Sequence, residues 1–177
     1  MTNDGALDDG ASDTPLAYDG AALKLEEFLP YRLNVAASLV SQALSRIYAQ
    51  RYGIGVPEWR VLVTLGQYGV MTGKAIGAHS HMHKTKVSRA VAQLERRKLV
   101  GRRANRADMR ESLLSLTPAG RAVYIDLAPS ALAFARALIE AVEPSDRAAF
   151  ERALALLTER SARLATEAAA GRSAKLK

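Results

Sequence analysis

One segment of the sequence has the pattern of two short helices, a tight turn between them and a hairpin after them, an order that leaves few folds open. Apolar residues recur at helical spacing over 73–79 and again over 83–98, with Ser80-His81 between the two stretches. Two short strands joined by a turn-rich loop follow over 99–116. Because a hairpin of this length is not stable alone, we expect it to pack on the preceding helices.

Helical stretches lie on both sides of this segment. One helix is predicted from Leu29 to just before Gly53. Another short helix is predicted after it, from Val56 to about Tyr68. After the hairpin, Thr117 is a suitable N-cap with proline at the first helical position, and two helices rich in Ala and Leu follow over about 118–141 and 145–168. Since 49% of the residues are hydrophobic but only 6% aromatic, we expect a mainly α fold with a small β-hairpin.

The charges are distributed unevenly along the chain. Residues 1–28 carry seven acidic side chains and a single lysine, a net charge of −6. Residues 57–118 carry twelve Lys or Arg against four acids, a net charge of +8. A basic block of this kind is the electrostatic footprint of a nucleic-acid-binding face, and an ordinary solvated basic surface is the alternative.

Polar and basic residues crowd the N-terminal half of the second helix of the segment. An α-helix fits the major groove of duplex DNA, where its N-terminal residues reach the base edges. An arginine-bearing hairpin beside it can reach the minor groove or the backbone. We therefore predict contacts with double-stranded DNA from five residues of this helix, which are Lys84, Thr85, Lys86, Ser88 and Arg89.

Two stretches of the sequence resemble the MarR family of regulators. The run from Lys86 to Val100 is similar to the recognition helix and first wing strand of that family. Residues 108–110 and 116–120 resemble its wing signature, D-x-R followed by L-T-x-x-G, and the order of elements agrees over residues 29–168. The resemblance implies a winged helix-turn-helix flanked by dimerisation helices, acting as a homodimeric repressor on a near-palindromic operator. A sequence-neutral architectural DNA-binding protein is the alternative.

The resemblance also implies roles for residues of the wing. Arg106 and Arg110 are expected to enter the minor groove, with Asp108 holding a wing arginine outward through an ion pair. Arg102 and Arg103 are expected to neutralise phosphate or to support the wing.

One position departs from the family pattern. Lys98 stands at the turn from helix to strand, where the family usually has glycine. Lysine there either adopts a left-handed backbone conformation at some cost, or the chain turns in another way.

The family resemblance further implies a small effector molecule. Members commonly release DNA when an aromatic or phenolic carboxylate enters a crevice beside the dimerisation helices. Tyr31, Arg32, Trp59 and Arg60 supply rings and cations near that expected crevice, where an arginine can pair with a carboxylate while a ring stacks on it. The alternatives are that Trp59 belongs to the core and that Arg60 pairs with Glu58 or with a backbone carbonyl.

Other kinds of chemistry have little support in the sequence. The chain has no cysteine, which excludes disulfides and cysteine redox switches. His79, His81 and His83 alternate in a turn and do not converge as metal ligands, so we expect turn capping or phosphate contact from them. The sequence has no glycine-rich phosphate loop, nucleophile elbow or H-E-x-x-H motif. We expect neither an enzyme nor a bound cofactor or metal.

These patterns predict five regions and a location. The first ten residues lack the apolar stretch of a signal peptide, and we find no uninterrupted apolar run near the ~20 residues that a membrane helix needs. We therefore expect a cytoplasmic protein that does not contact a membrane. The regions are a disordered acidic arm (1–22), an N-terminal dimerisation helix (23–56), the winged helix-turn-helix (57–118), C-terminal dimerisation helices (119–170) and a flexible tail (171–177).

Overall fold

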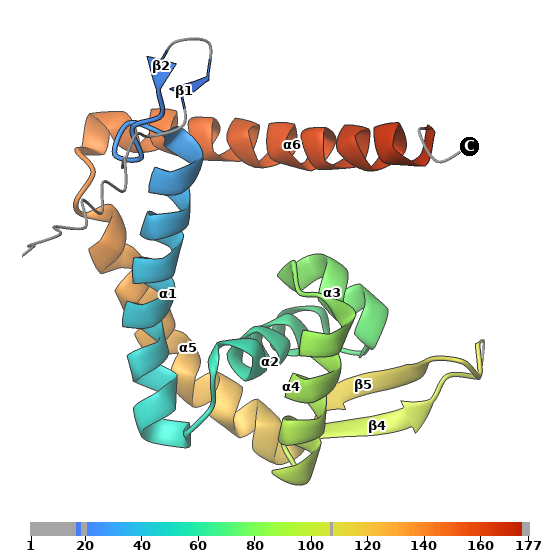
Figure 1. The fold of residues 1–177 in the computed structure, drawn as a ribbon. Coiled ribbons are helices and arrows are strands. Elements are labelled where there is room, and N and C mark those ends of the chain that lie inside the picture. The colour runs from blue at the N-terminus through green and yellow to red at the C-terminus, as the bar shows by residue number, and fades with distance from the viewer. Residues whose placement is uncertain (1–16, 19–20, 107, 175–177) are drawn as a thin grey trace, which may run out of the picture. The chain divides into compact units, whose positions relative to one another are not determined.

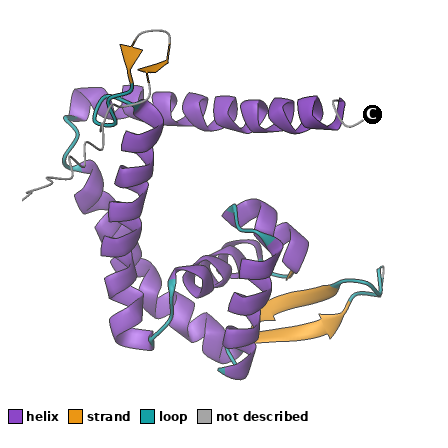
Figure 2. Cartoon of the chain, viewed as in Figure 1, coloured by secondary structure: helices purple, strands orange, loops and turns teal. Residues whose placement is uncertain are grey.

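A computed structural model of the chain describes residues 17–18, 21–106 and 108–174, and these are mainly helical (Figures 1 and 2). Two compact units are distinguished, residues 1–46 and residues 47–177. The described helices are α1 (Leu29–Tyr52), α2 (Val56–Tyr68), α3 (Gly73–Ser80), α4 (Lys84–Arg96), α5 (Pro118–Ile139) and α6 (Pro144–Ala174).

The described strands form two small antiparallel sheets. The pairing of β4 with β5 runs from Val100 opposite Leu116 to Ala104 opposite Ser112, and this hairpin is the wing. The short strand β3 pairs with the other edge of β5, which gives the order β3-β5-β4. The predicted mainly α fold with a hairpin is therefore confirmed, and β3 is an addition that the sequence pattern did not predict. The strands are β1 (Ala17–Tyr18), β2 (Ala21–Ala22), β3 (Met71–Thr72), β4 (Val100–Ala104) and β5 (Ser112–Leu116).

The helix ends follow local signals in the sequence. The hydroxyl of Thr72 accepts a hydrogen bond from the backbone N–H of Ala75 at 3.2 Å and caps α3. In the same way Thr117 caps α5, with its hydroxyl 3.0 Å from the nitrogen of Gly120. Gly53, directly after α1, has a φ of +57°, which glycine adopts without a steric penalty. The N-cap predicted at Thr117 is confirmed.

The core of the second unit holds α2, α3 and α4 together. Leu62, Ile76 and Leu94, one from each of these helices, are 0% exposed. Each such side chain contributes roughly 1.5–3 kcal/mol by burial, before the cost of ordering the chain is counted. The packing therefore fixes α3 and α4 on α2 and leaves the opposite face of α4 free for other contacts.

Only one residue, Thr117, lies between β5 and α5. Its backbone N–H donates to the carbonyl of Leu99 at 3.0 Å, and its hydroxyl donates to the carbonyl of Lys98 at 2.7 Å. Next to it Gly120 lies so close to the backbone that an added Cβ would be 1.9 Å from the Leu99 oxygen. The wing and α5 are therefore joined by a short and tightly bonded junction.

The two chain ends are only partly described. Most of the predicted disordered arm, residues 1–22, lies outside the described residues, and β1 and β2 fall within it. Helix α6 continues to Ala174, so residues 171–174 of the predicted flexible tail are helical, while 175–177 lie outside the described residues.

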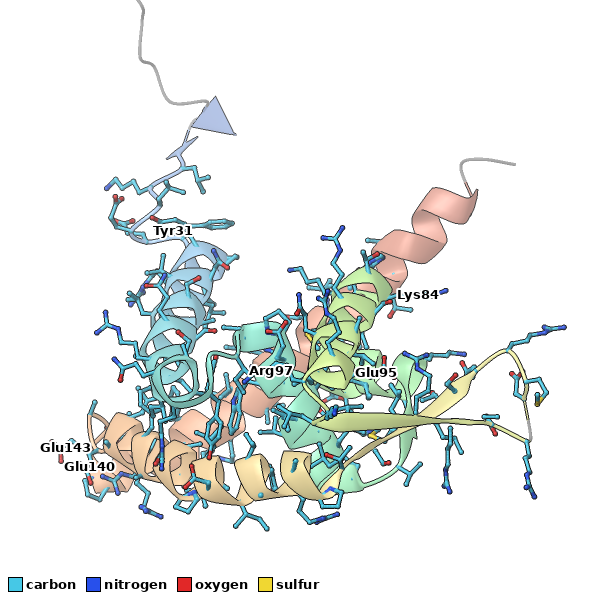
Figure 3. All side chains as sticks on the ribbon, turned by 90° about the horizontal axis from the view of Figure 1, so that it is seen from below. Tyr31, Lys84, Glu95, Arg97, Glu140 and Glu143 are labelled. Atoms are coloured by element: carbon cyan, nitrogen blue, oxygen red, sulfur yellow. The ribbon has the colours of Figure 1, made fainter. Side chains whose placement is uncertain are left out.

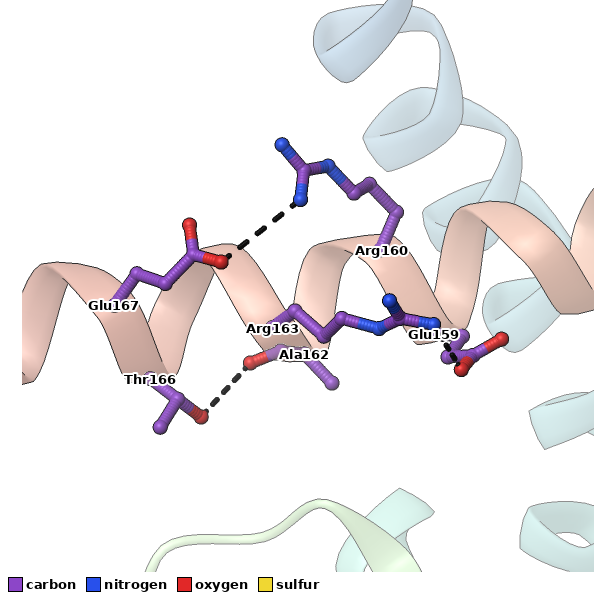
Figure 4. A network of polar contacts seen from close by, with 6 residues as sticks. All are labelled: Glu159, Arg160, Ala162, Arg163, Thr166 and Glu167. Carbon is purple, nitrogen blue, oxygen red and sulfur yellow. Dashed lines mark hydrogen bonds and ion pairs between the residues drawn. The ribbon is translucent and has the colours of Figure 1, made fainter.

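The polar side chains drawn in Figure 4 bond to one another within α6. Glu159 pairs with Arg163 one turn further on, and Arg160 lies 3.9 Å from Glu167. Exposed pairs within a helix add only about 0.2–0.5 kcal/mol each. A long helix in a protein is stabilised mainly by packing of its apolar face, so these ion pairs alone do not explain the stability of α6.

Among the described helices, α5 is the one long and apolar enough, by length and composition, to cross a membrane. The helix is not an uninterrupted apolar run, because the charged residues Arg121, Asp126 and Arg136 divide it. The helix also packs in the second unit, where Val123 and Leu127 are buried. Only 11% of the most apolar 18-residue stretch of α5 is buried, however, so the helix has a large exposed apolar face.

Candidate nucleic-acid interface

Helix α4 separates its apolar and polar residues onto two faces. Val87, Ala90, Val91 and Leu94 are buried against the rest of the fold. The residues predicted to contact DNA lie on the other face, and all five are exposed: Lys84, Thr85, Lys86, Ser88 and Arg89.

The turn before α4 is shaped by histidines. The imidazole Nδ1 of His83 accepts a hydrogen bond from the backbone N–H of Thr85 at 3.3 Å and caps the helix. His81 has a left-handed backbone with a φ of +51°, and the ring of His79 lies against Tyr68 with centroids 4.3 Å apart. Turn capping and phosphate contact were the two roles expected for these histidines, and His83 has the capping role. The free backbone N–H groups and the dipole at this helix end favour an anion such as phosphate.

Asp108 shapes the tip of the wing. Its carboxylate Oδ1 accepts a hydrogen bond from the backbone N–H of Arg110 at 2.9 Å, and its backbone carbonyl accepts one from Glu111 at 3.1 Å. In the described part of the chain no ion pair joins Asp108 to an arginine, so the carboxylate holds the backbone turn rather than a guanidinium. The side chains of Arg106 and Arg110 are both exposed at this tip.

A cleft of 670 Å³ separates α4 from the wing. Residues of α3, α4 and the hairpin line it, among them Lys74, Lys84, Arg102 and Arg110. Four cations face one carboxylate there, that of Glu111. A cleft with this charge suits the phosphate backbone of a nucleic acid, since phosphate contacts fix a protein on the duplex.

Three residues, Arg102, Arg103 and Lys98, lie between the end of α4 and the middle of the wing. Arg102, on β4, pairs with Glu95 on α4, so of the two roles expected for it the structure shows support of the wing. Arg103 is exposed beside it. Lys98 has a φ of +57°, so the position without glycine uses the left-handed conformation and not another turn.

The four residues proposed for an effector lie in different surroundings. Tyr31 and Arg32 are exposed residues of the first unit. In the second unit Trp59 is buried, and its ring stacks on Tyr48 with centroids 5.2 Å apart. Burial raises the pKa of the Tyr48 phenol, and the charge of nearby Arg60 partly offsets that effect. Trp59 therefore acts as a core residue here, while Arg60 is exposed.

Sequence reasoning missed three charged residues of this region. Lys74 lines the cleft from α3, Glu95 pairs with Arg102 on the next element of the chain, and Arg97 bonds to Gly53, which is distant in the sequence. Helical spacing predicts only the face of the helix on which such a residue lies. For Lys74, the basic character of the segment was the one signal in the sequence that pointed to this site. The partners of Glu95 and Arg97 come from tertiary structure.

Comparison with known proteins gives the same assignment for this region. A model of the MarR family matches residues 54–112, which include α2, α3, α4 and most of the wing. An uncharacterised HTH-type transcriptional regulator of Bacillus subtilis, YwoH, is 28% identical over 122 residues, covering 69% of this chain and 88% of the relative.

Solved structures are similar over a longer part of the chain. A MarR-family regulator from Silicibacter pomeroyi is 29% identical with a TM-score of 0.64, covering 79% of this chain and 92% of the other. BpsR of Bordetella bronchiseptica is 22% identical with a TM-score of 0.61, covering 72% and 98%. The structure of BpsR is described as explaining how 6-hydroxynicotinic acid regulates its DNA binding. Because the two sequences are only 22% identical, the similarity to BpsR shows a common fold and no more than that.

Proposed function

The chain belongs to the MarR family of winged helix-turn-helix transcription regulators, and we propose that it binds a near-palindromic operator as a homodimer and represses transcription there. Membership makes the protein a DNA-binding regulator and not an enzyme. The observation that carries the proposal is the cleft that Lys84 and Ser88 of α4 share with Arg110 of the wing. A helix and a hairpin on either side of one basic cleft can engage the major groove and the adjacent minor groove together.

In this proposal the two elements have different tasks. The first turns of α4 read base edges in the major groove and contact phosphate near the helix N-terminus. The wing places guanidinium groups in the narrow minor groove, and the bond from Asp108 to the backbone of Arg110 supports the proposed turn. The residues assigned to DNA are Lys84, Thr85, Lys86, Ser88, Arg89, Arg106, Asp108 and Arg110.

The proposal of a homodimer rests on apolar surface that the single chain leaves open. Ile125 and Leu132 on α5 are each 60% exposed, and Leu156 on α6 is 65% exposed. Apolar faces of this extent mark an interaction surface in a soluble protein. A second copy is the occupant that a two-fold operator requires, because it presents two recognition helices about one duplex turn apart. Burial of this face by the second copy would also explain the apolar composition of α5 without a membrane.

We further propose that a small aromatic or phenolic carboxylate releases the protein from DNA. The regulation of BpsR by 6-hydroxynicotinic acid supports this effector class. On this chain Tyr31, Arg32 and Arg60 are exposed, whereas Trp59 is reached only by a ligand that displaces part of its cover. The guanidinium groups would pair with the carboxylate and the rings would stack on the ligand.

The proposed organisation keeps the five regions given by the sequence. They are the acidic arm (1–22), the tail (171–177), residues 57–118, which contact DNA, and residues 23–56 and 119–170, which form the dimer. A regulator of this family acts where the chromosome is, so we propose a cytoplasmic location.

The first test is a fluorescence-anisotropy titration of the full chain against the DNA directly upstream of its own gene, with excess random duplex. We expect a preference for the specific site of about 10³-fold or more. Equal affinity for random DNA would replace the regulator with an architectural DNA-binding protein. Absence of binding to either duplex would contradict the proposal altogether.

Single substitutions assign the contact to the proposed face. Arg89→Ala and Arg110→Ala should each weaken binding to the specific site, by about 5- to 150-fold if the contact is to a base. Arg136→Ala, at an exposed arginine on α5 outside the DNA-facing set, is the charge-matched control, and it should leave the affinity unchanged once size-exclusion chromatography shows that its dimer is intact. An equal effect of all three would mean that net charge, and not this face, determines binding.

The effector is tested separately with 6-hydroxynicotinic acid and benzoate as probes. Either should release the preformed complex, and Arg32→Ala should raise the concentration needed. If no aromatic acid releases the complex, the effector class is wrong while the DNA-binding proposal stands.

A further inference from the structure

The last turn of α1 is bonded to α5 by two side chains. The hydroxyl of Tyr52 donates to Oδ2 of Asp126 at 2.8 Å, and Nη2 of Arg51 lies 3.0 Å from Oδ1 of the same carboxylate. The hydrogen bond to Asp126 raises the pKa of the Tyr52 phenol, because the bond favours the protonated form. Both carboxylate oxygens of Asp126 are thus used to hold the end of α1.

Arg97, at the end of the recognition helix α4, bonds to the same end of α1. It is the residue directly after α4, at the opposite end from Lys84 (Figure 3). Its Nη1 donates to the carbonyl of Gly53 at 3.3 Å and its Nη2 to the carbonyl of Tyr52. The last carbonyls of a helix have no partner within the helix, and here one planar guanidinium bonds both the carbonyl of Tyr52 in the last turn and that of Gly53 directly after it.

Tyr52 is therefore the common element of the two attachments. Its side chain bonds to α5 and its carbonyl bonds to the end of α4. The backbone around it has little freedom, since the N–H of Gly53 donates to Ala49 at 2.8 Å and Ile54 is only 2% exposed. A shift of α5 at Asp126 would act on Arg97 through a short bonded path.

We propose that Arg97 and Asp126 are positioning residues, which set the orientation of the recognition helix through the end of α1 and so tune the affinity for DNA. Neither acts by touching DNA. The inference rests on the proposed operator binding and goes beyond it, because it names residues outside the DNA-facing set that control affinity. It also names the route by which a change at α5 reaches α4.

The first experiment separates positioning from a phosphate contact, the other role open to an exposed arginine. Arg97→Lys keeps the positive charge but loses the planar fork that reaches two carbonyls. We expect it to weaken operator binding about 10-fold, while the slope of log affinity against log salt concentration stays as in the natural chain. If Arg97 binds phosphate, Arg97→Lys keeps the affinity and Arg97→Ala lowers that slope by about one. That result would overturn the proposal.

The second experiment is a double-mutant cycle on operator affinity with Arg97→Lys and Asp126→Asn. Because both act through the end of α1, we expect the double variant to lose clearly less affinity than the product of the two single losses. Arg96→Lys combined with Asp126→Asn is the matched control, and its losses should multiply. Losses that multiply in the Arg97 cycle as well would overturn the proposal.

Both experiments are run well below the unfolding midpoint of each variant, with folding checked by circular dichroism. A purely structural role lowers the midpoint but does not change the affinity of a fully folded protein. Tyr52→Phe, which removes only the hydroxyl, is the milder variant if Asp126→Asn does not fold, and it should couple to Arg97→Lys in the same direction. Failure of the natural chain to bind any operator would instead contradict the proposed function.

Discussion

The guanidinium of Arg102 forms two hydrogen bonds with the carboxylate of Glu95, with Nε 2.8 Å from Oε1 and Nη2 3.1 Å from Oε2. This paired geometry joins strand β4 of the wing to the recognition helix α4. The hydrogen bond to Glu95 raises the pKa of Arg102 above its ordinary value, because the bond favours the charged guanidinium. The angle between the wing and the helix thus has a specific chemical support.

Loss of this pair should weaken DNA binding. Glu95→Gln removes an acidic group near the DNA-binding face, which by charge alone would strengthen binding. We expect the opposite, about a threefold loss of operator affinity, because the wing is no longer held; an exposed pair of this kind is worth about 0.2–1 kcal/mol. Glu111→Gln, which also removes an acid from this face, should strengthen binding. A gain of affinity with Glu95→Gln would show that the pair does not position the wing.

Replacement of Lys98 by glycine should stabilise the fold. Lys98 has a φ of +57°, and the left-handed region costs a residue with a side chain roughly 1–2 kcal/mol that glycine avoids. Since glycine also loses more entropy on folding, we expect a net gain of about 0.5–1 kcal/mol in the free energy of unfolding by urea. Lys98→Ala is the control, because it removes the charge but keeps the strain. Equal stability of the two variants would contradict this explanation.

Introduction of a methyl group at Gly120 should destabilise the junction between the wing and α5. An added Cβ would lie 1.9 Å from the carbonyl oxygen of Leu99, and both groups belong to backbone that cannot move independently. We expect Gly120→Ala to cost about 3 kcal/mol, at the upper end of the range for overpacking. The control is Gly73→Ala in α3, where nothing lies within 4 Å of the added atom. Thermal and urea unfolding should show a large loss for the first variant and a negligible change for the second.

The bond between Tyr52 and Asp126 should give a pH-dependent contribution to stability. The pKa of Tyr52 is raised in the folded state, so folding favours the protonated phenol. This contribution is therefore fully present below the unfolded pKa of about 10 and is lost as the pH rises through the folded value. The difference in unfolding free energy between the natural chain and Tyr52→Phe should be constant from pH 7 to about 9 and shrink above pH 10. A difference that stays constant up to pH 11 would mean that the phenol is not bonded to Asp126.

Local signals in the sequence predicted most of the elements. The N-caps Thr72 and Thr117 are short-range hydrogen bonds, and α4 has a regular apolar face. Such features depend on neighbours within about one helical turn, so a single sequence is enough to find them. The exposed face of α4 follows for the same reason.

The remaining features depend on contacts between distant segments. Strand β3 has two residues and pairs with β5 some forty positions later, so it has no periodicity to detect. The two bonds of Arg97 are to backbone carbonyls, which are the same in every residue type and leave no mark on the sequence. Trp59 shows a different limit, because a tryptophan suits both the core and a ligand site, and the sequence left both interpretations open. Composition could not choose between the two.

The junction at Thr117 has a consequence for the lengths that related chains can have. A single residue separates β5 from α5, and its bonds to Lys98 and Leu99 fix both neighbours. An insertion or deletion there would rotate the start of α5 by about 100° about the helix axis and turn its buried residues outward. At the wing tip Arg106 and Met109 are exposed, and a change of length there would not rotate a helix that has a buried face. Related chains can therefore differ in length at the tip of the hairpin more readily than at the junction, where the start of α5 is fixed in register.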